Sequence, residues 1–523
     1  MKTTLRLTLA AFGLAIFNLS AATLHVSLES PNPTAPYADW ATAARVIQDA
    51  VDAAKAGDTV LVTNGVYATG SRDVSVLVTN QEPPLVSIGP SRVVVTNSIT
   101  LLSVNGSAAT MIVGDRVWNG EFGNYADGTN RCVYLGGYAV LSGFTLTNGN
   151  ALYANGGGVY SEPSAVVTNC TLIENFADNS GGGAYGGALN NCMVVGNEVM
   201  GGGAGACMAT LNGCTITHNT AFGYGGSVGS GGGGGVQDCT LKNCTLTGNS
   251  GRWGGGAVSS TLYNCTLTGN SALAGGGAEH CTLYNSTLTG NRALLDGPIL
   301  GVMRGGGGAE NCTLYNCTLV GNYAENSNGG GASSGTLLNC IVYYNSGGNY
   351  AEGTTLNYCL TAPLPTDGIG NVTGPPLFVD LAAGDLRLRE DSPCVDGGTN
   401  LLGSPIMGGW DWAIVDHITD PTDILGNTRF IDGNGDRVVA WDIGAYEFNS
   451  FKPPRFAVSP QRTSEGWTLN ITGPVNKWVR LQRSGNLKDW EEIWSGFMWE
   501  ANQQVNDADT GPGAMFYRAV SVP

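Results

Sequence analysis

Charged side chains that could do acid–base chemistry are few and scattered along this chain. The isolated candidates are Glu279, His280, His218, Arg252 and Arg304. Hydrolysis by paired carboxylates needs both groups on one face, and proton abstraction needs a base within hydrogen-bond reach of its substrate. A lone His or Arg in a repetitive chain is more often a turn or solvated residue, so we predict no catalytic residue.

Aromatic and arginine side chains gather where the chain carries extra residues between regular segments. The insertions are Thr220–Ser230, Arg292–Arg304 and Tyr323–Asn328, and a further polar insertion runs from Asp115 to Asn130. Loops on a rigid scaffold often carry binding residues, and aromatic faces beside polar groups suit sugar rings. Ligand binding is therefore one prediction for these loops, and the other is that they only cover an apolar edge. The candidate ligand-binding residues are Trp118, Tyr125, Tyr224, Trp253, Arg304 and Tyr323.

An oxygen-rich segment towards the C-terminus could bind a cation. Asp432-Gly-Asn-Gly-Asp436 places carboxylate and amide oxygens at alternating positions, with Asp442 downstream. Calcium takes such oxygen ligands. However, Asp442 stands eleventh, and Ile443 occupies the twelfth position, where an EF-hand-like loop needs its carboxylate. Calcium at Asp432, Asn434, Asp436 and Asp442 is therefore one prediction, and a tight Asx turn without a metal is the other.

All of these candidates depend on a repeat that fills the middle of the chain. A Cys, replaced once by Ser286, recurs in steps of 22, 22, 30, 21, 21, 31 and 23 residues, and an Asn always follows five residues later. Within each copy, Cys-Thr-Leu-Thr alternates apolar and polar side chains with the period of a strand, and the Gly runs disfavour helix. Three short strands per copy, stacked about 4.8 Å apart, predict a right-handed parallel β-helix. The Cys positions are Cys170, Cys192, Cys214, Cys244, Cys265, Cys317 and Cys340.

Stacking in register predicts columns of like side chains. Cys and Leu should fill the interior, and Thr should face outward. An Asn precedes most of the Cys positions, and because Asn tolerates the left-handed region, we place a turn there, with its amides bonded along the stack. Stacked free thiols are the favoured state of the buried Cys column, and scattered disulfides are the alternative. The turn residues are Asn169, Asn191, Asn243, Asn264, Asn285, Asn316 and Asn339.

One segment near the N-terminus runs Ala43-Ala-Arg-Val-Ile-Gln-Asp-Ala-Val-Asp-Ala-Ala-Lys-Ala-Gly-Asp-Thr-Val-Leu-Val-Thr-Asn-Gly-Val-Tyr67. It resembles the entry segment of pectin-lyase-like β-helix proteins. We expect a helix over Ala38–Ala56, capped by Asp39, with Trp40 on its apolar face. The resemblance implies that this helix plugs the open end of the β-helix, which would otherwise expose strand edges.

The repeats over about 150–345 also resemble those of polymorphic outer-membrane adhesins, with Leu where those repeats favour Phe. The pectin-lyase-like group includes polysaccharide lyases and hydrolases. The paired Asp and Gly-His-Gly motifs of polygalacturonase-like enzymes are absent here, and the expected outward column is Thr rather than Asp. We therefore predict a non-catalytic adhesion or glycan-binding protein; the alternative is a polysaccharide lyase or glycoside hydrolase that acts on acidic polysaccharide, similar to pectate lyase.

The chain as a whole is predicted to be all-β, with four segments. Residues 1–22 have the basic start, apolar run and small residues of a signal peptide. Residues 23–373 form the β-helix with its N-terminal cap, residues 374–449 form a C-terminal cap, and residues 450–523 alternate like a small β-sandwich.

Composition restricts the partners. The net charge of −17, with only 12% charged residues, disfavours nucleic acid and anionic membranes. No other apolar run is long enough to span a bilayer, so the chain is not transmembrane after removal of the signal. We expect a secreted or cell-surface monomer whose partner is a polysaccharide or cell-surface glycan, with no cofactor apart from possible Ca²⁺.

Overall fold

The computed structural model describes residues 21–77, 85–116, 129–223, 232–294, 305–325, 329–400, 422–429, 431–434, 438–448, 455–456, 460–463, 466–472, 478–486, 488–498, 502–508 and 516–521. The chain divides into two compact units. The first unit contains Met1–Pro376, Thr422–Gly426 and Ile443–Tyr446, and the second contains Leu377–Pro421, Asn427–Asp442 and Glu447–Pro523. The predicted signal peptide falls almost wholly outside the described residues.

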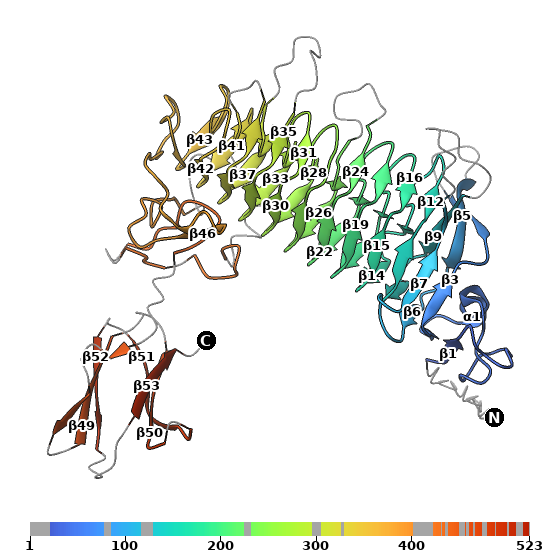
Figure 1. The fold of residues 1–523 in the computed structure, drawn as a ribbon, viewed down its shortest axis with the longest axis horizontal. Helices are drawn as coiled ribbons and strands as arrows, with labels where there is room; N and C mark the ends of the chain where they lie inside the picture. Colours follow the sequence, from blue (N-terminus) through green and yellow to red (C-terminus); the bar gives the residue numbers. More distant parts are fainter. Residues whose placement is uncertain are drawn as a thin grey trace, which may run out of the picture. The chain divides into compact units, whose positions relative to one another are not determined.

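The first unit is a parallel β-helix, as predicted (Figure 1). Three long sheets run along it, and each coil contributes one short strand to each sheet. The first sheet contains β1 (Thr23–Val26), β2 (Thr59–Val62), β6 (Thr100–Ser103), β10 (Val140–Ser142), β14 (Val166–Thr168), β18 (Ala188–Asn190), β22 (Thr210–Asn212), β26 (Thr240–Lys242), β29 (Thr261–Tyr263), β33 (Thr282–Tyr284), β37 (Thr313–Tyr315), β41 (Thr336–Leu338) and β43 (Thr355–Asn357).

The other two long sheets follow the same order of coils. The second sheet contains β3 (Gly65–Tyr67), β7 (Thr110–Val113), β11 (Thr145–Thr147), β15 (Thr171–Ile173), β19 (Met193–Val195), β23 (Thr215–Thr217), β27 (Thr245–Thr247), β30 (Thr266–Thr268), β34 (Thr287–Thr289), β38 (Thr318–Val320), β42 (Ile341–Tyr343) and β44 (Leu360–Thr361). The third sheet contains β4 (Arg72–Leu77), β5 (Leu85–Val95), β9 (Thr129–Leu135), β13 (Val159–Ser161), β17 (Ala184–Tyr185), β21 (Ala206–Cys207), β25 (Val236–Gln237), β28 (Ala257–Val258), β32 (Ala278–Glu279), β36 (Ala309–Glu310) and β40 (Ala332–Ser333), with β8 (Asp115–Arg116) paired to β9.

A fourth, shorter line of strands lies at one corner of the coils, and we call it the corner ladder. It contains β12 (Asn150–Ala151), β16 (Phe176–Ala177), β20 (Glu198–Val199) and β24 (Thr220–Ala221), followed by β31 (Ser271–Ala272), β35 (Arg292–Ala293) and β39 (Tyr323–Ala324). Single bridges through Ser250 join the two groups, and a bridge from Tyr323 to Ser346 extends the line.

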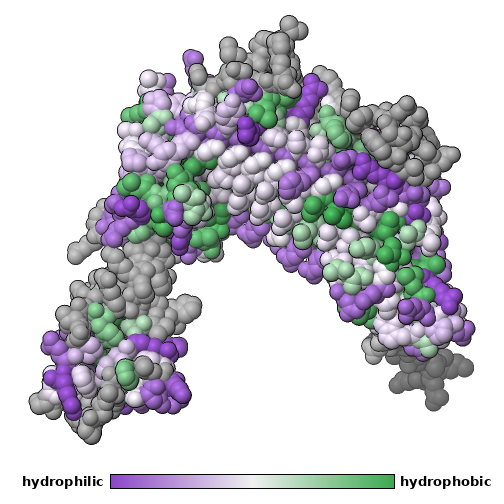
Figure 2. Space-filling model, viewed as in Figure 1, coloured by the Kyte–Doolittle hydropathy of each residue, from purple (hydrophilic) through white to green (hydrophobic). Residues whose placement is uncertain are grey.

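The interior follows the predicted alternation. Central leucines of the first and second sheets, such as Leu241, Leu262, Leu246 and Leu267, are fully buried, and the flanking threonines face outward. Over the middle coils the visible surface is pale, as expected for Thr, Ser and Gly rather than charged residues (Figure 2). The apolar core is therefore one continuous column inside the coils.

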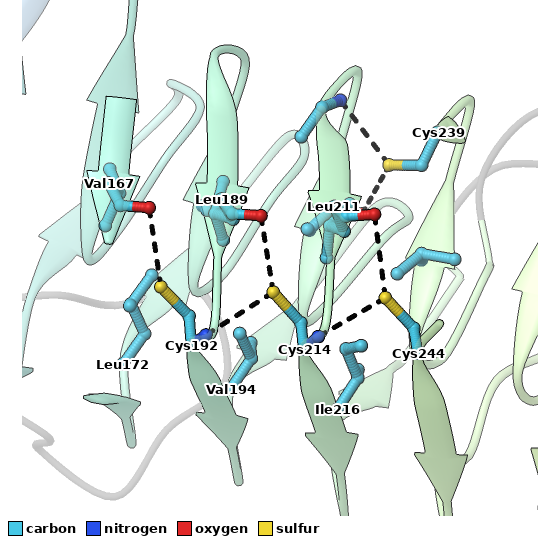
Figure 3. Packing of buried hydrophobic residues seen from close by; sticks show 14 of the residues in the cluster. Val167, Leu172, Leu189, Cys192, Val194, Leu211, Cys214, Ile216, Cys239 and Cys244 are labelled. Carbon is cyan, nitrogen blue, oxygen red and sulfur yellow. Dashed lines mark hydrogen bonds between the residues drawn. The ribbon is translucent and has the colours of Figure 1, made fainter. Parts of the chain in front are cut away.

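All fourteen cysteines are free and buried, which confirms the prediction of stacked thiols. Figure 3 shows Cys192, Cys214 and Cys244 in successive coils. The Sγ atom of Cys214 donates to the carbonyl oxygen of Leu189 at 3.4 Å and accepts from the backbone N–H of Cys192 at 3.5 Å. The Cys214 thiol thus pairs with two backbone groups of the preceding coil.

Two asparagine positions hold the coils together. The Asn that precedes most of the repeat Cys positions, or Ser286 in their place, has a positive φ, from 47° at Asn285 to 55° at Asn243, so the predicted turn is confirmed. The Asn five residues after the Cys is buried and forms a second ladder. The Nδ2 of Asn270, for example, donates to Oδ1 of Asn291 at 3.0 Å and to the carbonyl oxygen of Leu246 at 2.9 Å.

The N-terminal helix is shorter than predicted: α1 spans only Ile47–Ala53. Asp39 accepts hydrogen bonds from Thr42 in a separate turn, and Trp40 is exposed. Ala44 pairs with Val26 of β1, so residues before α1 are held extended, and tertiary pairing overrides helix propensity. Ile47, Ala50 and Val51 join the core; the role of α1 as a plug stays a prediction. In the described part of the chain, no helix has the length and apolar character needed to cross a membrane.

Two short C-terminal segments pack on the side of the β-helix. The backbone N–H of Gly444 donates to the carbonyl oxygen of Asn339 at 2.7 Å, and the Nδ2 of Asn285 donates to the carbonyl oxygen of Thr422 at 2.8 Å. The backbone N–H of Ile424 donates to the carbonyl oxygen of Ala445 at 3.0 Å, which joins the two segments. The boundaries predicted for a C-terminal cap stay a prediction.

The second unit begins with an antiparallel hairpin and ends with two antiparallel sheets. Leu469, Ile471 and Val505 of one sheet and Leu481 of the other form a common buried core, which is the arrangement of a small β-sandwich. The hairpin is β45 (Phe378–Asp380) and β46 (Asp385–Leu388). The sheets contain β47 (Arg455–Phe456), β48 (Gln461–Thr463), β49 (Gly466–Thr472) and β52 (Asn502–Asp507), and β50 (Trp478–Ser484), β51 (Glu491–Phe497) and β53 (Phe516–Ser521).

Candidate ligand-binding site at the corner ladder

The corner ladder places a single column of side chains on its outer face, and the first two of them, Asn150 and Phe176, are buried. Its alternate residues pack inward: Ala151, Ala177, Val199 and Ala221 form a small apolar cluster of their own. Because strand side chains alternate between faces, the residues between them share the opposite face, in register from coil to coil. In order along the helix, this column is Asn150, Phe176, Glu198, Thr220, Ser250, Ser271, Arg292, Tyr323 and Ser346.

All three insertions in the repeats start from this column. Thr220, Arg292 and Tyr323 are the first residues of their insertions, and all three occupy the same register position of the ladder. The prediction that the insertions leave one corner is therefore confirmed at their bases. The predicted residues Tyr224 and Arg304 lie outside the described residues, as do Trp118 and Tyr125 of the earlier insertion.

Arginine side chains stack on aromatic rings at three places along this corner. The guanidinium carbon of Arg292 lies 5.2 Å from the ring centroid of Tyr323 in the next coil. Arg252 lies 5.7 Å from the ring of its neighbour Trp253, and Arg116 of β8 lies 5.0 Å from the ring of Phe176. A guanidinium over an aromatic ring is attracted through the quadrupole of the ring, and such a pair places charge and apolar surface side by side.

The three arginines differ in how their charge is balanced. An Arg116 nitrogen lies 2.6 Å from a Glu198 carboxylate oxygen, which neutralises it. Arg252 donates to the carbonyl oxygen of Gly223 at 3.3 Å. For Arg252 and the exposed Arg292, no carboxylate lies within ion-pair distance in the described part of the chain. The described part of the corner therefore carries two positive charges without an acidic partner.

Two of the predicted binding residues can be placed. Tyr323 is half-buried in the column, with Arg292 above its ring. Trp253 is only 8% exposed and packs against Val258 and Ala274, so most of its ring stabilises the corner rather than facing a ligand. Arg292 was not among the predicted binding residues, although aligning the coils on the ladder position places it one coil before Tyr323.

Two buried carboxylates lie in neighbouring coils on the outer side of the third sheet. Glu279 of β32 pairs in register with Glu310 of β36, and the two residues are 1% and 3% exposed. The Nδ1 of His280 lies 3.5 Å from Oε1 of Glu279. The sequence pointed to Glu279 and His280 but not to Glu310, because only the register of the coils brings the two acids together.

The candidate calcium ligands are only partly brought together. The carboxylate of Asp442 accepts hydrogen bonds from the backbone N–H groups of Asp396 and Phe448, and Oδ2 of Asp396 accepts one from the backbone N–H of Asn434. Burial raises the pKa of Asp442 to about 7. Among the described residues, no three His, Cys, Asp or Glu side chains form a metal-binding group. Asp436 lies outside them, so calcium binding at Asp432, Asn434, Asp436 and Asp442 stays a prediction.

Comparison with known proteins gives similarities of fold only. No family model matches the chain, and no curated protein matches it. Among solved structures, pectate lyase Pel9A aligns with a TM-score of 0.40 and 12% identity over 83% of this chain and 98% of that one. A rhamnogalacturonan lyase aligns with a TM-score of 0.34 and 14% identity, covering 70% and 92% of the two chains. The polygalacturonase from Erwinia carotovora aligns with a TM-score of 0.29 and 11% identity, covering 64% and 95%. The assignment of a parallel β-helix rests on the chain's own stacked parallel sheets.

Proposed function

We propose that this protein is a secreted or cell-surface, non-catalytic β-helix protein that binds an acidic glycan along the corner ladder. The observation that carries the proposal is the pair Arg292 and Tyr323, an exposed guanidinium held 5.2 Å from an aromatic ring and without an acidic partner in the described structure. A sugar ring can pack on apolar surface while its carboxylate meets the guanidinium.

The repetitive shape of the ladder supports a polymeric ligand. Successive coils repeat about every 4.8 Å, so binding positions recur along the helix axis. Ser250 and Ser271, both half-exposed, lie between the arginine positions and supply hydroxyl groups. Four basic side chains occur between residues 165 and 345, namely Lys242, Arg252, Arg292 and Arg304. Two of them, Arg252 and Arg292, lie at this corner, which matches the charge of an acidic chain.

The experiment compares polygalacturonate with methyl-esterified pectin, which keeps the same sugar but removes most of the charge. We expect the full chain to retain polygalacturonate, and retention to weaken with added salt because the contacts are exposed. Arg292→Gln should weaken the affinity about fivefold, as expected for one exposed charged contact. Lys242→Gln is the matched control, because Lys242 is exposed on the first sheet and its loss changes the net charge equally.

Equal retention of both polymers, together with unchanged binding by Arg292→Gln, would refute the proposal. A loss of binding that is equally large in Lys242→Gln would show that only the net charge matters. Secretion is tested by fractionating cells that express the full chain, and the monomeric state by light scattering in solution.

A second candidate function is cleavage of the same acidic polysaccharides. Glu279 and Glu310 favour it, because they are paired carboxylates in register, with His280 beside one of them. Their burial disfavours it, since a general acid or base must reach the substrate. The non-catalytic proposal is therefore preferred.

A further inference from the structure

The outer face of the corner carries a second column of side chains, two residues after the first. The backbone N–H of Leu273 donates to the carbonyl oxygen of Arg252 at 3.1 Å, and the N–H of Glu325 donates to that of Ala293 at 3.0 Å, so the coils stay in register here. The alanines before Leu273 and before Glu325 are buried, and the residues that follow them therefore face outward. In order along the helix, the second column contains Arg252, Leu273, Leu294 and Glu325.

Together, the two columns give four successive coils different charges: positive, neutral, positive and negative. The four coils carry the pairs Ser250 and Arg252, Ser271 and Leu273, Arg292 and Leu294, and Tyr323 and Glu325. Each of these eight residues is half-buried or exposed. A ligand on this face can therefore reach all four coils.

The two arginines are separated by an uncharged coil. Neighbouring coils lie about 4.8 Å apart, so the backbones that carry the two arginines lie at least about 10 Å apart. Arg252 donates to the carbonyl oxygen of Gly223 in the preceding coil at 3.3 Å, whereas the guanidinium of Arg292 lies 5.2 Å from the ring of Tyr323 in the following coil. The two guanidinium groups thus lean apart, and they match carboxylates on sugar residues that are not direct neighbours.

The coil between the arginines suits a neutral sugar. Leu273 offers half-buried apolar surface, on which the CH groups of a sugar ring can pack, and Ser271 offers a hydroxyl. A carboxylate at this coil would lose hydration without gaining a cation as partner.

The coil after Arg292 also disfavours an acidic sugar. Glu325 would repel a carboxylate placed beside it, but its oxygens can accept hydrogen bonds from sugar hydroxyls. Tyr323 of the same coil adds an aromatic ring. The surface therefore asks for charged and neutral residues in turn.

We propose that the corner ladder binds a linear polysaccharide in which uronate residues alternate with neutral sugars, one sugar residue to each coil. The uronates lie at Arg252 and Arg292, and the neutral residues lie at Leu273 and Tyr323. This inference rests on the proposed glycan binding and adds the charge pattern of the ligand. The net charge of −17 supports it, because a polymer with an acid on every residue would bring additional carboxylates to an acidic protein.

The experiment uses the full chain and compares two oligosaccharides of equal length by titration calorimetry. A hyaluronate octasaccharide alternates glucuronate with N-acetylglucosamine, whereas octagalacturonate has an acid on every residue. We expect the hyaluronate octasaccharide to bind about fivefold more tightly, and Arg292→Gln to weaken its binding about fivefold, as for one exposed charged contact.

Two further variants test the charge pattern itself. Glu325→Gln removes the repulsion in the fourth coil, so it should raise the affinity for octagalacturonate about threefold and leave hyaluronate binding unchanged. Glu352→Gln is the matched control, because Glu352 is exposed outside these four coils and its loss changes the net charge equally. Leu273→Arg places a guanidinium in the uncharged coil and should reverse the preference in favour of octagalacturonate.

The inference and the proposed function fail in different ways. If octagalacturonate binds as tightly as the hyaluronate octasaccharide or more tightly, the alternating pattern is wrong while acidic glycan binding stands. If neither oligosaccharide binds, both proposals are wrong. Hyaluronate binding that is unchanged in Arg292→Gln and in Leu273→Arg would also overturn the inference, because the ligand would then lie away from the corner.

Discussion

The hydroxyl of Thr318 accepts a hydrogen bond from the backbone N–H of Ala445 at 3.0 Å, across 127 residues of sequence. Thr318 belongs to an outward column of the second sheet in which Thr245 is exposed, yet Thr318 and Ala445 are fully buried. The segment Ile443–Tyr446 therefore covers part of the second sheet and belongs to the β-helix unit.

Replacing this hydroxyl should release the segment. Thr318→Val keeps the β-branched shape but leaves the Ala445 N–H buried without a partner, which costs about 1–3 kcal/mol. We expect faster hydrogen exchange at residues 443–446, with the sheets unchanged. Thr245→Val is the control, because it lies in the same column and is exposed. Equal exchange in both variants would mean that the bond does not hold the segment.

The fold was predictable because each coil repeats the same physical pattern. Leu267 and Cys265 point into the core of their coil because apolar and polar side chains alternate along the strand. Their counterparts in the next coil follow the same alternation, so one pattern predicts every coil. The helix was predicted too long because Ala44 pairs with Val26, a contact between segments that local propensity does not contain. Glu279 and Glu310 are 31 residues apart in sequence, and only register makes them neighbours.

The candidate site was less predictable, because the register between coils brings its residues together and the local sequence does not contain that register. Insertions interrupt the repeat, so their common corner and Tyr323 could be found by aligning the copies. Arg292 was part of an insertion boundary, and its position above Tyr323 follows from stacking. Asn150 and Arg116 come from the irregular first coils, where no repeat shows which side chains are buried or paired.

The buried Asn ladder should dominate the stability of the middle coils. Asn270 donates to Leu246 and Asn291 and accepts from the backbone N–H and the amide of Asn249. Asn270→Leu leaves these groups unpaired and should lower the free energy of unfolding by roughly 3 kcal/mol, measured by urea denaturation.

The control for this ladder uses the other Asn position of the same coil. Asn264 has a φ of 53°, which glycine adopts without strain. Asn264→Gly should therefore change stability little. A smaller loss in Asn270→Leu than in Asn264→Gly would contradict a structural role for the buried ladder.

The thiols should make the protein sensitive to alkaline pH. Burial raises the pKa of Cys132 to about 12 and that of Cys170 to about 11, from an ordinary value of 9.0. Above pH 9 the unfolded chain loses these protons while the folded chain keeps them, so stability falls as pH rises. Each of these two thiols should cost about 1.4 kcal/mol by pH 10.

Thiol chemistry supplies the matching measurement. At neutral pH the fourteen buried thiols should react with a disulfide reagent only after unfolding. Cys265→Ser should fold normally, because a serine already occupies this position in the next coil. The hydroxyl of Ser286 donates to the carbonyl oxygen of Tyr284 and accepts from the backbone N–H of Cys265. Rapid labelling of the native protein would contradict the buried column.

Calcium should stabilise the second unit if the predicted ligands act together. Burial raises the pKa of Asp442, and the pKa of Asp396 is also raised, by burial and by repulsion from Asp432. A bound cation would offset this repulsion between the carboxylates. We expect excess calcium to raise the unfolding temperature relative to EDTA, and Asp436→Asn to abolish the difference. Asp367→Asn, an exposed site, is the control; no calcium effect in the wild type would refute the site.

The paired acids give the decisive test of catalysis. Incubating the full chain with polygalacturonate, with and without calcium, should release neither unsaturated oligosaccharides nor new reducing ends. If product appears, Glu310→Gln should abolish it, because a neutral amide cannot act as base or nucleophile. Glu352→Gln, at an exposed position, should then keep full activity. If both variants form product equally, the chemistry takes place elsewhere. If only Glu310→Gln loses it, the binding proposal is replaced by an enzyme whose buried glutamates become accessible when substrate binds.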